Sequence, residues 1–386
     1  MSIALNEEQK MIQDTAREFA MAEVLPVADK LDPAKADIPE SLRQKLAELG
    51  FFGIMIPEQY GGLGLGALEY CIVTEELSRA WMSVASIIRP MMGYAYLSKD
   101  QMAQYLPKMA RGEFMCAFAM SEPGTGSDIA QLSCRAERDG GDWVITGSKY
   151  WCTFADGADA ILVLARTQPN ADASKPYQGI SAFLVPKARG TFPDGVKGSP
   201  IPKIGYYGWK TWELAFDRCR VPAANMVGAE GRGFYLATRS LEVARAHTAA
   251  RSIGLARAGL EDAISFARER IQFSQPIANF QAIRFKIADM ATQIEAARQL
   301  LYSVCAKIDS GERCDLEASM AKYFASEMAE RVTSEALQIH GGAGYTHHFA
   351  VERHWRDARL TKIFEGTSEI QMKIISDHLL GKTVKS

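Results

Sequence analysis

The chain has 386 residues, of which 44 are Lys or Arg and 46 are Asp or Glu, and 47% are hydrophobic. This length permits a large core and about two or three domains of ordinary size, which excludes a small scaffold held together by disulfides. The formal net charge of −2, with no basic run, excludes the field that attracts nucleic acid or an anionic membrane.

Several other classes are disfavoured by local patterns. No window approaches the ~18 uncharged apolar residues of a membrane span, and residues 1–10 lack the basic and apolar regions of a secretory signal, so we expect a cytoplasmic protein. The seven cysteines form no CxxC pair and the six histidines form no HExxH motif. Reduced thiols and no metal site are therefore expected.

Residues 1–115 are predicted to form an N-terminal helical domain. Asn6 and Gln9 have the spacing of a capping box, the apolar residues that follow recur at three and four, and Pro26 is expected to end this first helix. Further helices are predicted at 39–49, 68–79 and 99–109. The glycine-rich stretch 60–66 superficially suggests a dinucleotide loop, but no strand precedes it, which favours a plain loop.

Residues 116–228 are predicted to form a central β-domain. Short apolar runs at 114–120, 143–146, 161–167, 180–186 and 212–216 are separated by Gly, Pro, Asp and Asn. Because no ten-residue helices lie between these runs, a parallel sheet built from βαβ units is disfavoured, and an antiparallel barrel or sandwich is expected.

Residues 229–386 are predicted to form a C-terminal helical bundle. The last proline is Pro276, and long stretches rich in Ala, Arg, Glu and Leu predict helices at 231–270, 279–309, 315–340 and 368–380. Their apolar faces need partners, which a four-helix bundle supplies. The fold class is therefore α+β, in the order α, β, α.

One candidate catalytic residue precedes the last predicted helix. Ser368 and Gln371 have capping-box spacing, which places Glu365 in the loop before the helix. A carboxylate in such a loop, desolvated beside Phe364, would have a raised pKa and could act as a base near neutral pH. The alternative, a solvated loop residue, is left open by spacing alone.

Three other stretches suggest ligand binding without requiring it. In 121–128, glycines and hydroxyl residues after a strand suit a phosphate or a ring edge, although a plain turn has the same composition. In 338–345, Gly341 and Gly342 permit close approach of the backbone to a diphosphate, but two glycines directly after a helix chiefly indicate a C-terminal helix cap. In 268–273, the arginines are suited to binding a pyrophosphate. They are equally typical of a helix C-terminus, where a positive charge interacts favourably with the helix dipole.

Taken together, these stretches resemble the acyl-CoA dehydrogenase family from about residue 5 to 380. The carrying segments are 121–128 (SEPGTGSD), 150–153 (YWCT), 269–277 (ERIQFSQPI), 338–345 (QIHGGAGY) and 363–371 (IFEGTSEIQ). The resemblance implies a homotetrameric FAD flavoprotein with an N-terminal helical domain, a central β-domain and a C-terminal four-helix bundle. It also implies an acyl-CoA substrate and electron-transfer flavoprotein as the electron acceptor.

The resemblance further implies roles for individual residues. Glu365 would abstract the α-proton of the acyl-CoA thioester while the β-hydride passes to flavin N5. The isoalloxazine would be surrounded by Met120, Ser121, Gly126, Ser127, Trp151 and Thr153. The FAD of a neighbouring subunit would be reached by Arg270, Gln272, Phe273, Gln281, Gln338, Gly341 and Gly342. Thr367 and Glu369 would lie on the phosphate and adenosine side of the subunit's own FAD, and Ser127, Glu242 and Arg245 would contact the substrate.

The acyl group is the least determined part of this interpretation. Arg89 lies among apolar residues in 83–91, the segment that the resemblance assigns to the acyl pocket. Its guanidinium either extends to water or acts as a counter-ion for a carboxylate at the acyl end. Together with the unusual 205–211 (GYYGWKT), this predicts a branched, cyclic or dicarboxylic acyl group. The alternatives are a flavin oxidase of the same fold that uses oxygen, and a non-catalytic CoA-binding or assembly protein.

Overall fold

The structure is a computed structural model that describes residues 4–168 and 175–381. Helices come first: α1 (Glu7–Phe19), α2 (Leu25–Leu31), α3 (Glu40–Glu48), α4 (Ala67–Ala80), α5 (Met82–Ile87) and α6 (Lys99–Ala110). The capping box of Asn6 and Gln9 is confirmed. The prediction that Pro26 ends the first helix is wrong. A π-turn over Ala20–Val24 leads directly into α2, where Pro26 occupies the first turn and needs no N–H partner.

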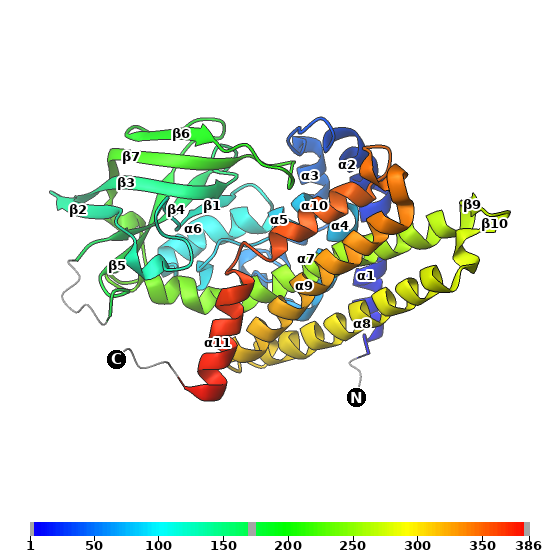
Figure 1. Cartoon of the computed structure of the whole chain (residues 1–386). Coiled ribbons are helices and arrows are strands. Elements are labelled where there is room, and N and C mark those ends of the chain that lie inside the picture. Colours follow the sequence, from blue (N-terminus) through cyan, green and yellow to red (C-terminus); the bar gives the residue numbers. More distant parts are fainter. Residues whose placement is uncertain (1–3, 169–174, 382–386) are drawn as a thin grey trace.

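The central part is one mixed sheet. Its strands are β1 (Cys116–Ala119), β2 (Arg135–Asp139), β3 (Asp142–Thr153), β4 (Ala160–Arg166), β5 (Ile180–Pro186), β6 (Val196–Pro200), β7 (Thr211–Pro222) and β8 (Met226–Val227). They run in the order β6-β7-β3-β2-β4-β5-β8, with β1 beside β4 (Figure 1). All five predicted strands are confirmed. The expected antiparallel pairing holds for most neighbours, but β4 pairs in parallel with β1 and β2.

The C-terminal part consists of long helices, as predicted. They are α7 (Gly233–Glu269), α8 (Gln281–Asp309), α9 (Asp315–His340), α10 (Val351–Thr361) and α11 (Ser368–Leu380). The short α10 was not among the predicted helices. Between α7 and α8, the strands β9 (Ile271–Gln272) and β10 (Gln275–Pro276) form a hairpin at the end of the molecule opposite the β-domain (Figure 1). Gly341, with φ of 59°, ends α9, which confirms the predicted cap.

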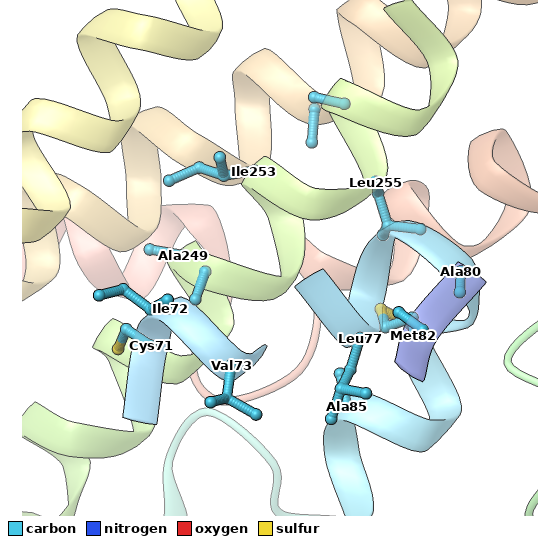
Figure 2. Packing of buried hydrophobic residues seen from close by; sticks show 14 of the residues in the cluster. Cys71, Ile72, Val73, Leu77, Ala80, Met82, Ala85, Ala249, Ile253 and Leu255 are labelled. Atoms are coloured by element: carbon cyan, nitrogen blue, oxygen red, sulfur yellow. The ribbon is translucent and has the colours of Figure 1, made fainter. Parts of the chain in front are cut away.

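The helical parts share one core in which α4 packs against α7. Figure 2 shows Cys71 and Ile72 of α4 close to Ala249 and Ile253 of α7, all of them buried. The helices approach closely because α7 is rich in small residues. A Cβ added to Gly254 would lie 2.4 Å from the Glu75 carbonyl oxygen. No helix in the described ranges is long and apolar enough to cross a membrane.

Candidate active site

A cavity of about 640 Å³ lies where the β-domain meets both sets of helices. Its wall combines the ends of β1 and β3, the segment after α5, the middle of α7 and the loop before α11. Ten of the predicted site residues line it: Arg89, Met120, Ser121, Gly126, Ser127, Trp151, Thr153, Arg245, Glu365 and Thr367. Since these residues come from all three predicted domains, only the folded chain assembles the site.

The loop that carries Glu365 is held rigidly. Lys322 of α9 donates to the Gly366 carbonyl oxygen at 2.7 Å, and the Gln371 side chain donates to the same oxygen at 3.0 Å. Glu365 itself has φ of 54°, an uncommon conformation for a residue with a side chain. The capping box predicted for Ser368 is wrong by one residue. Thr367 is the N-cap, and its hydroxyl accepts from the Ile370 N–H.

The Glu365 carboxylate is paired with Arg89. The Arg89 guanidinium donates from Nη1 to Glu365 Oε1, and only 28% and 17% of the two side chains are exposed. The first alternative for Arg89, extension into water, is therefore wrong: the guanidinium stays in the cavity and has a carboxylate partner. The partner in this structure is the chain's own candidate base.

The loop 121–128 is anchored by a buried ion pair. Glu122 accepts from the backbone N–H groups of Ser133 and Cys134 at 2.7 and 2.8 Å and from Lys149 Nζ at 3.0 Å. Burial raises the pKa of the Glu122 carboxyl, but Lys149 and the Ser133 donors outweigh it and keep the pKa below its ordinary value. The glycines beyond this anchor are open, since an added Cβ on Gly124 or Gly126 would meet nothing within 4 Å.

The cavity wall concentrates unusual backbone conformations. Trp151, Phe154, Tyr206 and Glu365 are non-glycine residues with positive φ, and all four line the cavity. Such conformations cluster at functional sites. Trp151 is 57% exposed although its strand neighbour Cys152 is fully buried. A large aromatic face held open beside accessible backbone fits a planar ring system such as a flavin.

The other predicted FAD residues lie away from this cavity. Arg270, Gln272 and Phe273 belong to the exposed hairpin between α7 and α8, at the far end of the long helices (Figure 1). Gln281, Gln338, Gly341, Gly342 and Glu369 are also exposed and do not line the cavity. Within one chain the structure does not bring them together with the cavity residues.

The two remaining substrate candidates belong to a polar cluster beside the cavity. Arg245 is 5% exposed and donates to Asp315 at 3.2 Å, and it lines the cavity. Glu242, one turn earlier on α7, pairs with Arg313 at 3.4 Å and lies outside the lining. Burial and the nearby Asp315 raise the pKa of the Glu242 carboxyl.

Sequence reasoning missed three polar residues around Glu365. His247 and Arg251 line the cavity from α7 and are almost fully buried, and Lys322 supports the loop. His247 and Arg251 are four residues apart on an alanine-rich helix, which places them on one face. Two polar residues on one face of a helix so rich in alanine were a usable signal. Lys322 offered none, because its partner is a backbone carbonyl.

Comparison with known proteins identifies the class. Models of the acyl-CoA dehydrogenase N-terminal, middle and C-terminal domains match residues 6–113, 117–219 and 231–380. The chain is 40% identical to a 3-(aryl)acrylate reductase of Clostridium sporogenes, over 97% of this chain and 99% of that protein. It is 41% identical to a (2S)-methylsuccinyl-CoA dehydrogenase of Cereibacter sphaeroides, over 97% of this chain and 70% of that protein. The solved structure of a glutaryl-CoA dehydrogenase in complex with glutaryl-CoA is 35% identical in sequence and has a TM-score of 0.93. The match covers 99% of this chain and 98% of that chain.

The chain belongs to the acyl-CoA dehydrogenase family. It is an FAD-dependent oxidoreductase that acts on acyl-CoA, as the resemblance implied. The three-part fold predicted from the sequence is that of the solved relatives. In the described ranges no group of three or more His, Cys, Asp or Glu side chains is placed to hold a metal ion.

Proposed function

We propose that the protein converts an acyl-CoA thioester to its 2-enoyl-CoA, with Glu365 as the base. The α-carbon loses a proton to the Glu365 carboxylate, the β-carbon loses a hydride, and the two carbons form a double bond. When bound, FAD supplies the oxidant that takes the hydride at N5. The observation that carries the proposal is the position of Glu365. Among the described residues that line the cavity, it has the one carboxylate, and its loop is held from α9 and α11.

The chain's other residues suit binding and orientation. Met120, Ser121, Gly126, Ser127, Trp151 and Thr153 surround the space that the isoalloxazine would occupy, with Thr367 nearby. The Glu365 backbone N–H would donate to the thioester oxygen as negative charge develops there, which lowers the barrier to proton removal. Arg245 would bind on the CoA side.

We propose electron-transfer flavoprotein as the acceptor of the electrons and a homotetramer as the assembly. The tetramer is supported by exposed apolar side chains on the hairpin and α8, such as Phe273 and Phe285, and by the exposure of the residues that the resemblance assigns to a neighbouring FAD. In a tetramer those residues would complete the FAD site of another subunit. The acyl group is proposed to be branched, cyclic or dicarboxylic. Two of the compared proteins are named for dicarboxylic acyl-CoAs, which supports the last of these.

The test is anaerobic titration of the yellow protein with a panel of acyl-CoAs. Substrate should bleach the flavin, and Glu365→Gln should leave FAD and CoA-thioester binding intact while nearly abolishing bleaching, because the amide cannot accept the α-proton. Glu312→Gln, an exposed glutamate in the turn between α8 and α9, is the matched control and should bleach normally. Undiminished bleaching by Glu365→Gln would mean that another group is the base.

Two further readouts separate the alternatives. Peroxide formed in air at the rate of substrate oxidation would favour the oxidase. A colourless protein that binds CoA thioester without FAD would favour a non-catalytic binding protein.

A further inference from the structure

The charges around Glu365 are unbalanced. Among the described residues, the cavity that holds the Glu365 carboxylate is also lined by several basic side chains, which are Arg89, Lys203, Arg245, Arg251, Arg356 and Arg359. Arg245 is neutralised by Asp315, Arg356 by Asp32 and Glu352, and Arg359 by Glu330. Lys203 donates to the carbonyls of Tyr206 and Trp209. Arg89 and Arg251 are left to share Glu365.

Arg251 is a buried cation whose hydrogen-bond partners in the described part of the chain are uncharged. It is 2% exposed, and its guanidinium donates to the hydroxyls of Ser86 at 2.9 Å and Thr248 at 3.0 Å. Its Nε has no hydrogen-bond partner among the residues that the structure describes, and its Cζ lies 4.5 Å from the centre of the Phe364 ring, one residue before Glu365. Burial lowers the pKa of Arg251. The negative charge of the nearby Glu365 acts to raise this pKa, and the positive charge of Arg89 lowers it further. Both guanidiniums therefore lie within electrostatic reach of one carboxylate.

Catalysis disturbs this arrangement. To take an α-proton, the Glu365 carboxylate must turn toward the substrate and share or give up its bond to Arg89. Once Glu365 has taken the proton it is neutral, so a neutral acyl chain would leave the two buried guanidiniums without a carboxylate, which is costly because charges withdrawn from water need partners. An acyl chain with its own carboxylate would replace Glu365 on Arg89 and release it for proton abstraction.

We infer that the substrate is a short dicarboxylic acyl-CoA whose distal carboxylate is bound by Arg89 and Arg251. This inference rests on the proposed function and selects one of its three acyl classes. The spacer must be short, since Arg89 now touches the same carboxylate that has to reach the α-carbon. Acyl groups of the succinyl and glutaryl type meet this condition. Arg89 thus acts as a specificity-determining residue that exchanges the enzyme's carboxylate for the substrate's.

The experiment compares thioesters that differ only in the terminal group. Glutaryl-CoA is paired with pentanoyl-CoA, and succinyl-CoA with butyryl-CoA, because a carboxylate replaces a methyl in each pair. In anaerobic flavin reduction, the holoenzyme should prefer the dicarboxylic member. Arg89→Met should lower that preference about thirtyfold or more, the size expected for removing one partner of a desolvated charge pair. Arg89→Lys should retain part of it.

A control and a binding measurement complete the design. Arg111→Met removes an exposed positive charge that pairs with Glu113 outside the cavity, and it should leave the preference unchanged. In Glu365→Gln, calorimetry should show an affinity for glutaryl-CoA over pentanoyl-CoA larger than in the wild type, because the substrate no longer competes with Glu365 for Arg89.

The outcomes separate the inference from the proposed function. Flavin reduced faster by the neutral thioesters, or a preference unaffected by Arg89→Met, overturns the inference and leaves the proposed function standing. If no thioester reduces the flavin, the proposed function fails. Calorimetry then still decides whether Arg89 binds the distal carboxylate. Equal affinities for glutaryl-CoA and pentanoyl-CoA would overturn the inference about Arg89 as well.

Discussion

Removing Lys149 should destabilise the β-domain strongly, because this residue neutralises a carboxylate at the base of the 121–128 loop. Its ammonium group is fully buried and donates to Glu122 Oε1 and to the Met120 carbonyl, both at 3.0 Å. In Lys149→Met the methionine fills most of the same space. Glu122, only 6% exposed, keeps its bonds to Ser133 and Cys134 but loses its counter-ion.

The expected cost is about 3–5 kcal/mol in the free energy of unfolding, the range for breaking a buried ion pair by removing one partner. A matched control lies on β2 of the same sheet. Arg135 pairs with Glu137 at 3.2 Å, but the two side chains are 57% and 64% exposed. Arg135→Met should therefore cost no more than about 1 kcal/mol.

Urea unfolding of the holoenzyme, followed by tryptophan fluorescence, measures both costs. Flavin fluorescence gives the affinity for FAD, which should fall in Lys149→Met because the loop that carries the proposed cofactor contacts Ser121 and Gly126 loses its anchor. The double variant Lys149→Met, Glu122→Gln should lose less unfolding free energy than the two single variants lose together, because the neutral amide introduced at position 122 needs no ammonium partner. Equal unfolding free energies for Lys149→Met and Arg135→Met would refute the reasoning.

Two further predictions concern the catalytic loop and the assembly. Burial lowers the pKa of Lys322 from 10.5 to about 8. The unfolded chain therefore binds more protons between these values, so stability should rise with pH across that interval. Lys322→Met should lack this part of the rise in urea unfolding, and an identical rise in both proteins would contradict the assignment. Phe273 is 88% exposed on the hairpin. Phe273→Ser should lower the mass measured by light scattering and speed the loss of FAD, whereas Met11→Ser, which removes another exposed apolar side chain, should do neither. An unchanged mass would exclude the hairpin from the proposed subunit contact.

Elements were predictable where the local pattern determines the structure. The helices α7, α8 and α9 follow from long periodic stretches, and the strands β4 and β5 from apolar runs between turn residues. The prediction for Pro26 was wrong because the effect of a proline depends on its position: in the first turn of α2 its missing N–H needs no partner, so the helix can begin there. The parallel pairing of β1 with β4 joins segments that no hairpin connects, so local sequence carried no sign of it.

The residues of the site were predictable through motifs, whereas their partners were not. Glu365 was singled out by its loop and by the family motif, but the motif says nothing of the Arg89 guanidinium that its carboxylate meets 276 positions away in the chain. A contact of that kind depends on how α5 and the loop before α11 are packed around α7. Lys149 and Glu122 were unpredictable for the same reason: on β3 two breaks in register, one of them between Lys149 and Cys152, change which residues face inward.

This distinction bears on acyl specificity within the family. Three of the five motifs that identify the class, 121–128, 150–153 and 363–371, contribute residues to the cavity wall, where the chemistry common to all acyl-CoA thioesters is proposed to take place. Arg89, on which the inferred specificity depends, lies outside every motif, in a segment whose remaining residues are mostly apolar. Its contact with Glu365 couples selection of the acyl group to release of the base: a substrate that does not satisfy the guanidinium leaves the base engaged. Specificity would then appear mainly in the rate of proton abstraction, and thioesters that bind poorly at Arg89 should be slow substrates even at saturation.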